Sequence, residues 1–445
     1  MACGTTAHTR SNRPPPRPND TLSDMDSNRR RSSESLTHRS VNANDRLGWT
    51  RYQTENRERR LLYVTTVPAT LRSFLKGQNL FMKDRGFELF AASSPGSALE
   101  DVSERDGVQV FPVEIPREIR PLQDLRALFT LRKVIREVQP DLLHVSTPKA
   151  ALLGALAGAW CRVPTRLFLI RGLATENEIG LWRTLYRCAE ALTAACCHES
   201  VAVSPSLLEF ARSERIVGPG VGRVAGHGMS NGIDVSRFDP DNTAEVNLGP
   251  FLPSTAPVPE RWLGFVGRLT RDKGIEDLAE AWLWLRDRYP DWGLILVGPW
   301  SEYDRVSNAV RVQLEEDPRV VLPGLRRNVP EWLKRMDLFL FPSHGTEGFP
   351  NSPMEAAAMA LPVVGTQVVG SVDAVEEGVT GTLVPPRDVP ALTEAASQYM
   401  ENPELRNKHG GAGRERVVQK FQREQVWEGL YSIYEDLLIS RDRAS

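Results

Sequence analysis

The sequence predicts an α/β protein built from two doubly wound domains, each a parallel sheet with helices around it. Short β-branched and aromatic runs alternate with longer helical stretches, which is the pattern of parallel strands joined by crossover helices. The alternation occurs in two series, and the segment between them contains four prolines. The 445 residues are 41% hydrophobic and 25% charged, an ordinary globular composition that suffices for two sizeable cores.

Residues 1–60 differ from the rest, because they contain twelve arginines, seven acids and few large apolar side chains. Such a segment cannot bury enough surface to offset its ordering entropy, so we predict a disordered tail. It lacks the apolar core of a signal peptide, and its acids argue against a transit peptide. Two interpretations of the tail stay open. It can contact anionic lipid or a partner, or it can be a dispensable extension.

The two series define the domains. Residues 61–240 form a Rossmann-like domain, with strands expected at 61–67, 87–92, 108–113, 142–146, 166–170 and 200–203. Residues 241–260 form the linker, because they are rich in proline and have little periodicity. Residues 261–420 form the second domain, with strands expected at 263–266, 293–297, 320–322, 338–341, 362–365 and 382–384. Residues 421–445 are expected to form a helix that packs back on the first domain. Ligands of open α/β sheets bind at the carboxyl ends of the strands, which predicts a cleft shared by the two domains.

Charge and cysteine content exclude several classes of function. The 55 Lys and Arg residues are balanced by 57 Asp and Glu residues, for a net charge of −2, which argues against a nucleic-acid binder. The five cysteines form neither a metal-type pattern nor a disulfide framework, so we expect a reducing, cytoplasmic location. No uncharged segment is long and apolar enough to span a bilayer.

The segment His344–Glu355 follows the predicted strand Leu338–Phe341 and leads into a helix. Ser352 is expected at the N-cap and Pro353 at the first helical position. A glycine-containing loop that ends at exposed helical N–H groups favours an anion such as a phosphate. Glu355 can instead close a capping box, and Glu347 can be a solvated loop acid.

The segment Gly267–Gly274 directly follows the predicted strand Leu263–Val266 and carries Arg268 and Lys273. Cations at this edge would face the same cleft and neutralise a leaving diphosphate, although a basic surface loop is the alternative. The chain has no Asp-x-Asp after a strand, no Gly-x-Ser-x-Gly, no Walker motif and no histidine pair at helical spacing. We therefore expect no metal site and an electrostatic mechanism.

In combination, these segments resemble the retaining GT-B glycosyltransferases of family 4. The resemblance extends over residues 61 to about 440 and points to the bacterial subgroup that makes capsular polysaccharides, exopolysaccharides and lipid-linked oligosaccharides. It rests on Glu347 and Glu355 with seven residues between them, Arg268 with Lys273, and the segments Ser230–Asp234, Val329–Glu331 and Asp337–Ser343.

The resemblance implies a nucleotide-diphosphate sugar as donor, expected to be UDP-linked, and no cofactor. Arg268, Lys273 and Glu347 would be catalytic, with the two cations stabilising the leaving diphosphate. The donor would also contact Gly267, Gly348, Phe349, Pro350, Asn351 and Glu355, and the carboxylate of Glu355 would accept hydrogen bonds from the ribose. The acceptor hydroxyl would attack on the face that the nucleotide leaves, so no covalent nucleophile is required.

The resemblance also implies a lipid-linked or glycan acceptor held by the first domain, with an N-acetylated sugar as one candidate for transfer. The acceptor-side candidates are Thr66, Arg72, Lys149 and Arg171. A plain N-cap at Thr147–Pro148 and a surface position for Arg72 are the alternatives. Arg171 stands where many family members carry a histidine, and Gly370–Asp373 stands where a Gly-Gly-Ile/Val-Pro loop is common.

A lipid acceptor would require peripheral contact with the inner face of the membrane. Leu181 and Trp182, close to Arg183 and Arg187, are candidates for that contact, as is the helix from Pro148, for which covering the sheet is the alternative. Two other functions stay open. A catalytically silent GT-B subunit would not hydrolyse the donor, and a nucleotide-sugar epimerase would form an epimer without any acceptor.

Overall fold

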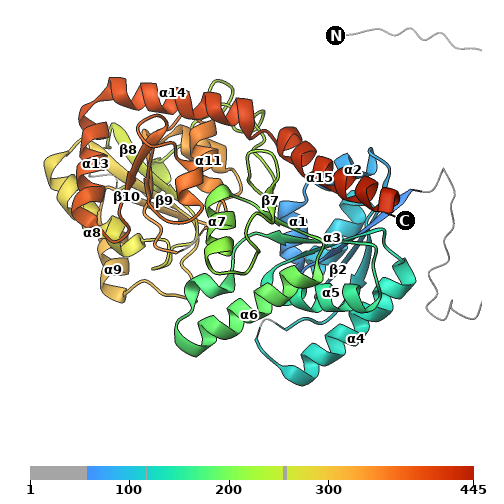
Figure 1. Ribbon diagram of the computed structural model, residues 1–445. Coiled ribbons are helices and arrows are strands. Elements are labelled where there is room, and N and C mark those ends of the chain that lie inside the picture. The colour runs from blue at the N-terminus through green and yellow to red at the C-terminus, as the bar shows by residue number, and fades with distance from the viewer. Residues whose placement is uncertain (1–57, 117, 254–257, 346, 445) are drawn as a thin grey trace, which may run out of the picture. The chain divides into compact units, whose positions relative to one another are not determined.

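The computed structural model describes residues 58–116, 118–253, 258–345 and 347–444. These residues form two parallel sheets with interspersed helices (Figure 1), so the predicted α/β fold class is confirmed. The predicted disordered tail lies outside the described residues, except for its last three positions. There the prediction is wrong, because strand β1 already begins at Arg59. Arg59 pairs with Glu435, and Arg60 pairs with Glu88 at 2.9 Å, so both cations are accommodated at the start of the strand.

The amino-terminal sheet has the strand order β3-β2-β1-β4-β5-β6-β7. The six predicted strands are present, whereas β7 has only two residues and leaves no pattern in the sequence. The strands are β1 (Arg59–Val64), β2 (Phe87–Ser93), β3 (Gln109–Pro112), β4 (Leu142–Ser146), β5 (Thr165–Ile170), β6 (Glu199–Ala202) and β7 (Arg223–Val224). The helices are α1 (Pro68–Phe74), α2 (Gln78–Lys83), α3 (Ser97–Asp106), α4 (Pro121–Val138), α5 (Pro148–Trp160), η1 (Ala174–Asn177), α6 (Gly180–Cys196) and α7 (Pro205–Ser213).

The carboxyl-terminal sheet has the order β10-β9-β8-β11-β12-β13. Its strands are β8 (Arg261–Val266), β9 (Trp292–Val297), β10 (Val320–Gly324), β11 (Leu338–Phe341), β12 (Val363–Thr366) and β13 (Gly381–Val384). Its helices are α8 (Ile275–Arg288), α9 (Asn308–Glu316), α10 (Val329–Lys334), α11 (Asn351–Ala358), α12 (Ser371–Ala374) and α13 (Val389–Glu401), and the turn η2 (Gly249–Phe251) lies in the predicted linker. Strand β11 is buried at all four residues, as expected for a parallel strand covered on both faces.

The last two helices return the chain to the amino-terminal sheet. Helix α14 (Pro403–Lys420) is followed by α15 (Arg423–Ala444), both in red in Figure 1. Helix α15 contacts β5 and α2, and the Tyr434 hydroxyl lies 2.5 Å from Nδ1 of His144 on β4. The carboxyl-terminal residues therefore join the core of the amino-terminal domain.

The segment Ser230–Asp234 binds the start of α15 and so holds the last helices in place. Nε1 of Trp427 donates to Oδ1 of Asn231 at 2.8 Å, and Arg423 pairs with Asp234 at 2.7 Å. A Cβ atom on Gly232 would lie only 2.6 Å from the Cα atom of Arg423, so this position requires glycine. The motif therefore stabilises a second connection between the two domains, in addition to the linker.

Candidate active site

The loops after β8 and β9 meet at the carboxyl edge of the second sheet. The Gly298 N–H donates to Gly324 O at 3.0 Å, and a Cβ atom on Gly298 would lie 1.7 Å from Gly267 O. Gly267 is therefore part of the backbone contact that forms this edge. Arg268 follows it and lines a cavity of about 800 Å³ with Arg271, His344 and other residues.

Lys273 and Glu347 form an ion pair, and their side chains are 19% and 13% exposed. The Ser343 hydroxyl donates to the same carboxylate oxygen of Glu347 at 2.8 Å. Lys273 comes from the loop after β8 and Glu347 from the loop after β11, which are neighbouring strands. The structure therefore brings together two of the predicted catalytic residues, although their catalytic roles stay predictions.

The backbone at Glu347 and Gly348 is held between the two domains. A Cβ atom on Gly348 would lie 1.9 Å from the carbonyl oxygen of Arg171, which belongs to the amino-terminal domain. On the other side, a Cβ atom on Gly370 would lie 1.9 Å from Glu347 O. Only glycine allows these approaches. The position of the Glu347 carboxylate thus depends on both domains.

Helix α11 begins differently from the prediction. It starts at Asn351, its N-cap is Pro350, and no side chain caps it. The predicted N-cap at Ser352 is therefore wrong, and with it the capping box to Glu355, because Ser352 already lies within the first helical turn. The helix begins earlier because Pro350 has an extended conformation, with φ −73° and ψ 130°, which suits an N-cap. The first-turn N–H groups keep their capacity to bind an anion.

Two of the predicted donor-binding residues, Phe349 and Pro350, have side chains that are buried in the protein. Phe349 is 7% exposed, and its ring lies 5.4 Å from that of Phe421 between α14 and α15. Pro350 is also buried, whereas Asn351 is exposed at the helix start. A donor contact at Phe349 or Pro350 would therefore use their backbone atoms.

Glu355 lies in the first turn of α11. Burial raises the pKa of its carboxyl group to about 7, although the charges of Arg237 and Arg423 oppose this rise. Arg423 also pairs with Asp234, so Glu355 faces the residues that join the domains. The contribution of this carboxylate to ribose binding stays a prediction.

We expect Glu355→Gln to raise the stability of the unliganded protein at pH 8 and to change it little at pH 5. The folded-state pKa of about 7 exceeds the ordinary 4.5, so stability falls as the pH rises from about 4.5 through 7 and the carboxylate ionises. The amide removes a cost of up to about 3 kcal/mol. Thermal unfolding at both pH values checks this, with Glu316→Gln on the exposed end of α9 as control. An equal shift at both pH values would contradict the expectation.

The cavity beside Arg268 also contains polar side chains to which the sequence had assigned no role. Nε2 of His344 lies 2.6 Å from Oδ2 of Asp277, and Arg271 pairs with Asp304 at 3.1 Å. Glu176, from η1, lines the cavity from the amino-terminal domain. The sequence shows that these residues follow predicted strands. It does not show which of the loops share a cavity, because that depends on how the two sheets are placed.

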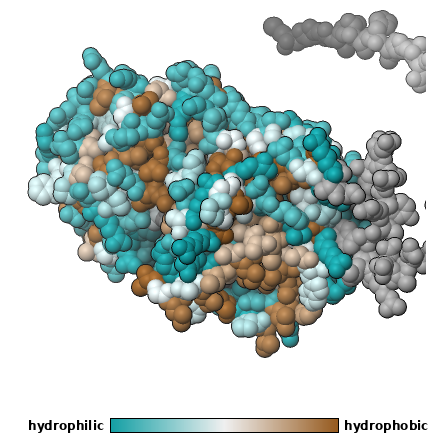
Figure 2. Space-filling view, viewed as in Figure 1, coloured by the Kyte–Doolittle hydropathy of each residue, from teal (hydrophilic) through white to brown (hydrophobic). Residues whose placement is uncertain are grey.

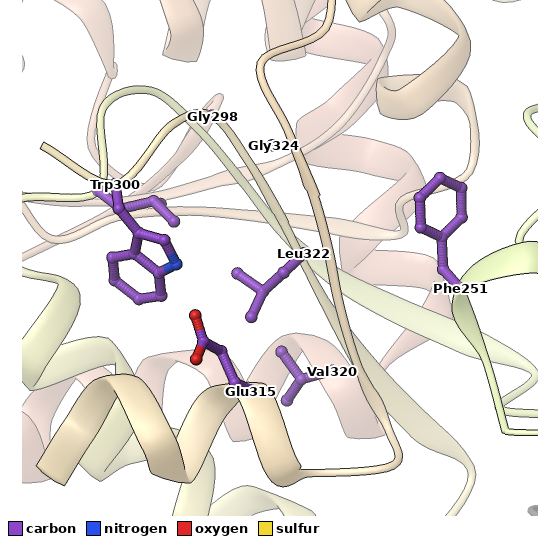
Figure 3. Close-up of a pocket in the computed structure, with 8 residues that line it drawn as sticks. Phe251, Gly298, Trp300, Glu315, Val320, Leu322 and Gly324 are labelled. Atoms are coloured by element: carbon purple, nitrogen blue, oxygen red, sulfur yellow. The ribbon is translucent and has the colours of Figure 1, made fainter. Parts of the chain in front are cut away.

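A second cavity, of about 420 Å³, is lined by residues at this same edge of the second sheet (Figure 3). Leu269 and Gly298 line it together with Trp300 and Phe251, and Glu315 of α9 points toward it. Its surface is at least as polar as it is apolar. The aromatic rings of Trp300 and Phe251 suit a flat heterocycle. No sequence pattern predicts this cavity, because Phe251 and Trp300 are far apart along the chain.

Three of the predicted acceptor-side residues are bound to neighbouring protein groups. The Thr66 hydroxyl lies 2.9 Å from that of Thr147 and accepts from the Ala150 N–H at 3.3 Å, so it helps to hold the start of α5. Lys149 pairs with Asp124 at 2.6 Å, and Arg72 pairs with Asp101 at 3.1 Å. The alternative of a surface position for Arg72 agrees with its exposure. Thr147 occupies the N-cap position of α5, but its hydroxyl makes no capping bond.

The fourth candidate, Arg171, follows β5 and interacts with a buried aromatic cluster. Desolvation lowers the pKa of its guanidinium to about 10, although the nearby phenols of Tyr434 and Tyr63 favour the charge. Desolvation also lowers the pKa of His144 in this cluster to about 3, so the imidazole is neutral. Arg171 thus connects the backbone contact with Gly348 to the core beneath α15. Its role toward an acceptor stays a prediction.

The departure at Gly370–Asp373 forms another contact between the domains. A carboxylate oxygen of Asp373 accepts from the Ser206 N–H at 3.1 Å and from the Ser206 hydroxyl. The Gly370 N–H donates to the same hydroxyl at 2.7 Å. Ser206 lies in the first turn of α7, so the substituted loop connects this helix to the second domain.

The described part of the chain contains no group of three or more His, Cys, Asp or Glu side chains that could hold a metal ion. None of its helices combines the length and the apolar character needed to cross a bilayer.

Two family models match the chain, one in each domain. Residues 81–226 match "Glycosyl transferase 4-like domain", and residues 260–402 match "Glycosyl transferases group 1". The chain is 28% identical over 383 residues to the capsular polysaccharide biosynthesis glycosyltransferase CapM of Staphylococcus aureus, covering 86% of this chain and 98% of that protein.

Two further similarities extend over most of the chain. An Escherichia coli UDP-Gal:alpha-D-GlcNAc-diphosphoundecaprenol alpha-1,3-galactosyltransferase is 24% identical, over 76% of this chain and 86% of that protein. The crystal structure of Anabaena HepE in complex with UDP and glucose superposes with a TM-score of 0.66 at 19% identity, over 85% of this chain and 99% of that one. The structural likeness supports the two-domain fold.

Proposed function

Because the chain belongs to the GT-B glycosyltransferases of family 4, with a glycosyltransferase 4-like first domain and a group 1 second domain, we propose that it transfers a sugar with retention of configuration. The donor is a nucleotide-diphosphate sugar, UDP-linked in this proposal, and the acceptor is a lipid-linked or polysaccharide glycan at the cytoplasmic face of a membrane. The relatives named for capsular and diphosphoundecaprenol-linked glycans support this choice of acceptor.

The observation that carries the proposal is the ion pair between Lys273 and Glu347 at the carboxyl edge of the second sheet. The loop of Lys273 also carries Arg268, and the loop of Glu347 leads into the uncapped start of α11. Two cations and helical N–H groups suit a diphosphate. As the bond to the sugar breaks, negative charge develops on the leaving diphosphate, and fixed positive groups stabilise it. In this scheme no metal ion is needed to neutralise that charge.

The ion pair also suggests how the site changes when a donor binds. In the structure, the ammonium group of Lys273 is neutralised by Glu347. We propose that, when the donor binds, Lys273 pairs with the diphosphate in place of Glu347. The Glu347 carboxylate can then accept hydrogen bonds from the donor sugar. The second cavity, which Gly298 and Trp300 help to line, would hold the base, and Glu355 would bind the ribose. The acceptor hydroxyl would then attack on the face that the nucleotide leaves.

The test is an incubation of the full chain with UDP-sugars and a polyprenyl-diphosphate-linked glycan, followed by mass spectrometry. The expected product is the acceptor extended by one sugar. NMR should show that the new glycosidic bond has the same anomeric configuration as the donor. An inverted product would contradict retention. Donor binding without hydrolysis or transfer would favour the silent subunit, and an epimer formed without acceptor would favour the epimerase.

A further inference from the structure

Helix α6 presents its apolar side to solvent and its polar side to the protein. Leu181, Leu185 and Leu192 lie on one face of the helix and are 83%, 49% and 47% exposed. The buried side instead carries Glu190, which accepts from the Ala174 N–H and from the Thr175 hydroxyl at 2.6 Å each. A helix on the surface of a soluble domain normally has the opposite arrangement. The outward leucines therefore need an explanation outside the core.

The same apolar surface continues over two neighbouring helices. On α4, Leu122, Leu125 and Phe129 are 79%, 51% and 49% exposed. The Phe129 ring lies 5.7 Å from that of Trp160 at the end of α5, which is half exposed. Helix α5 contacts both α4 and α6, and Figure 2 shows apolar side chains over this part of the molecule. We call it the α4–α6 surface. Such an extended exposed patch indicates an interaction site.

The charges on these helices select the partner. Helices α4, α5 and α6 carry seven Lys and Arg residues but three acids. Of the acids, Glu190 is buried and Asp124 pairs with Lys149. Arg126 and Lys133 are exposed on the same face of α4 as its apolar side chains, and Arg187 is exposed on α6. Two copies of this face would bring like charges together, whereas a layer of anionic headgroups would neutralise them.

We propose that the α4–α6 surface docks the protein on an anionic lipid bilayer. Its apolar side chains enter the boundary between headgroups and acyl chains, and its lysine and arginine side chains contact the headgroups. Trp160 and Trp182 are well suited to this boundary because their rings are amphipathic. The guanidinium of Arg132 lies 4.3 Å over the Trp160 ring, which places a cation beside the apolar surface.

The surface adjoins the mouth of the site. Helix α6 begins at Gly180, a few residues after Glu176, which lines the cavity beside Arg268. Helix α5 begins just beyond the carboxyl end of β4. Docking would therefore place the cleft close to the membrane, where a lipid-linked acceptor keeps its hydrocarbon in the bilayer. This last step rests on the proposed function, whereas the docking itself does not.

The test is flotation of the full chain with vesicles of phosphatidylcholine alone and with vesicles containing about one third phosphatidylglycerol. We expect binding to the anionic vesicles that weakens as the salt concentration rises. Replacing Leu181 and Trp182 by Ser should reduce partitioning about tenfold or more. The matched control replaces Leu283 and Trp284 by Ser, because this pair has the same side chains, 41% and 70% exposed, on α8 of the other domain.

Equal partitioning of the two double variants would overturn the proposal, and so would equal binding to both kinds of vesicle. A dimer in solution that the Leu181 and Trp182 changes dissociate, without vesicle binding, would identify a second copy as the occupant and overturn the lipid assignment. Transfer to a water-soluble acceptor tests the proposed function separately. Both double variants should retain it, and its absence from the unaltered chain would affect the proposed function and leave the docking result standing.

Discussion

Replacing Lys273 by Ala is expected to lower kcat by about a hundredfold to a thousandfold, the effect of removing one preorganised electrostatic group from a charge-developing transition state. The ammonium group is held at the carboxyl edge of the second sheet by Glu347. Its loss leaves a mostly buried carboxylate without its cation, so melting should also fall by a few degrees. The measurement is turnover with the UDP-sugar and acceptor that the transfer assay selects, together with the affinity for UDP.

Two further variants separate catalysis from stability. The double variant Lys273→Ala, Glu347→Gln removes the unpaired charge, so it should recover the melting temperature while turnover stays low. Arg271→Ala is the matched control in the same loop, because Arg271 pairs with Asp304 and its side chain is 60% exposed. An exposed pair contributes little. If Arg271→Ala impaired turnover as much as Lys273→Ala, the assignment of the diphosphate to Lys273 would be refuted.

Replacing Gly348 by Ala should lower turnover about a hundredfold, the scale reported for displacing catalytic groups by about 1 Å. The added Cβ atom would lie 1.9 Å from the carbonyl oxygen of Arg171, so the loop or the domain opposite must move. Because Glu347 precedes this glycine, its carboxylate moves with the loop. Stability should fall as well, since the displaced contact joins both domains.

Gly345→Ala is the control for this prediction, because it places the same methyl group in the same loop without a collision. The nearest atom to a Cβ at Gly345 is 3.7 Å away, on Asp272, which is an ordinary van der Waals distance. We expect nearly unaltered turnover. Comparable losses in both variants would mean that the loop is generally sensitive and that the contact between Gly348 and Arg171 has no special role.

The strand pattern could be predicted from the sequence because it depends on local chemistry. A parallel strand buried on both faces reads as a continuous apolar run, as in Leu338–Phe341, and all twelve predicted strands overlap strands of the structure. The two-residue strand β7 was missed because it is too short to leave a pattern. The start of α11 was misplaced because Ser352 and Pro353 are good capping residues locally, while the backbone at Pro350 determines where the helix begins.

The candidate site also has a part that the sequence predicted and a part that it could not predict. The spacing of Arg268 and Lys273 after one strand and of Glu347 after its neighbour predicted that they face one cleft, and Lys273 and Glu347 do meet. The surroundings of Thr66, Lys149 and Arg171 could not be predicted. Their partners, Thr147, Asp124 and the cluster beneath α15, belong to segments that only the folded chain brings near.

By itself the sequence determined the two parallel sheets, the edge where cations and acids gather, and the family to which the chain belongs. These follow from side-chain periodicity and from the rule that parallel strands end at one edge. Only the tertiary structure decided which charges neutralise one another, which glycines lie between the domains, and that the leucines of α6 face outward. Those outcomes depend on distances between residues far apart in the chain, and the free energy of each contact depends on burial that no local pattern records.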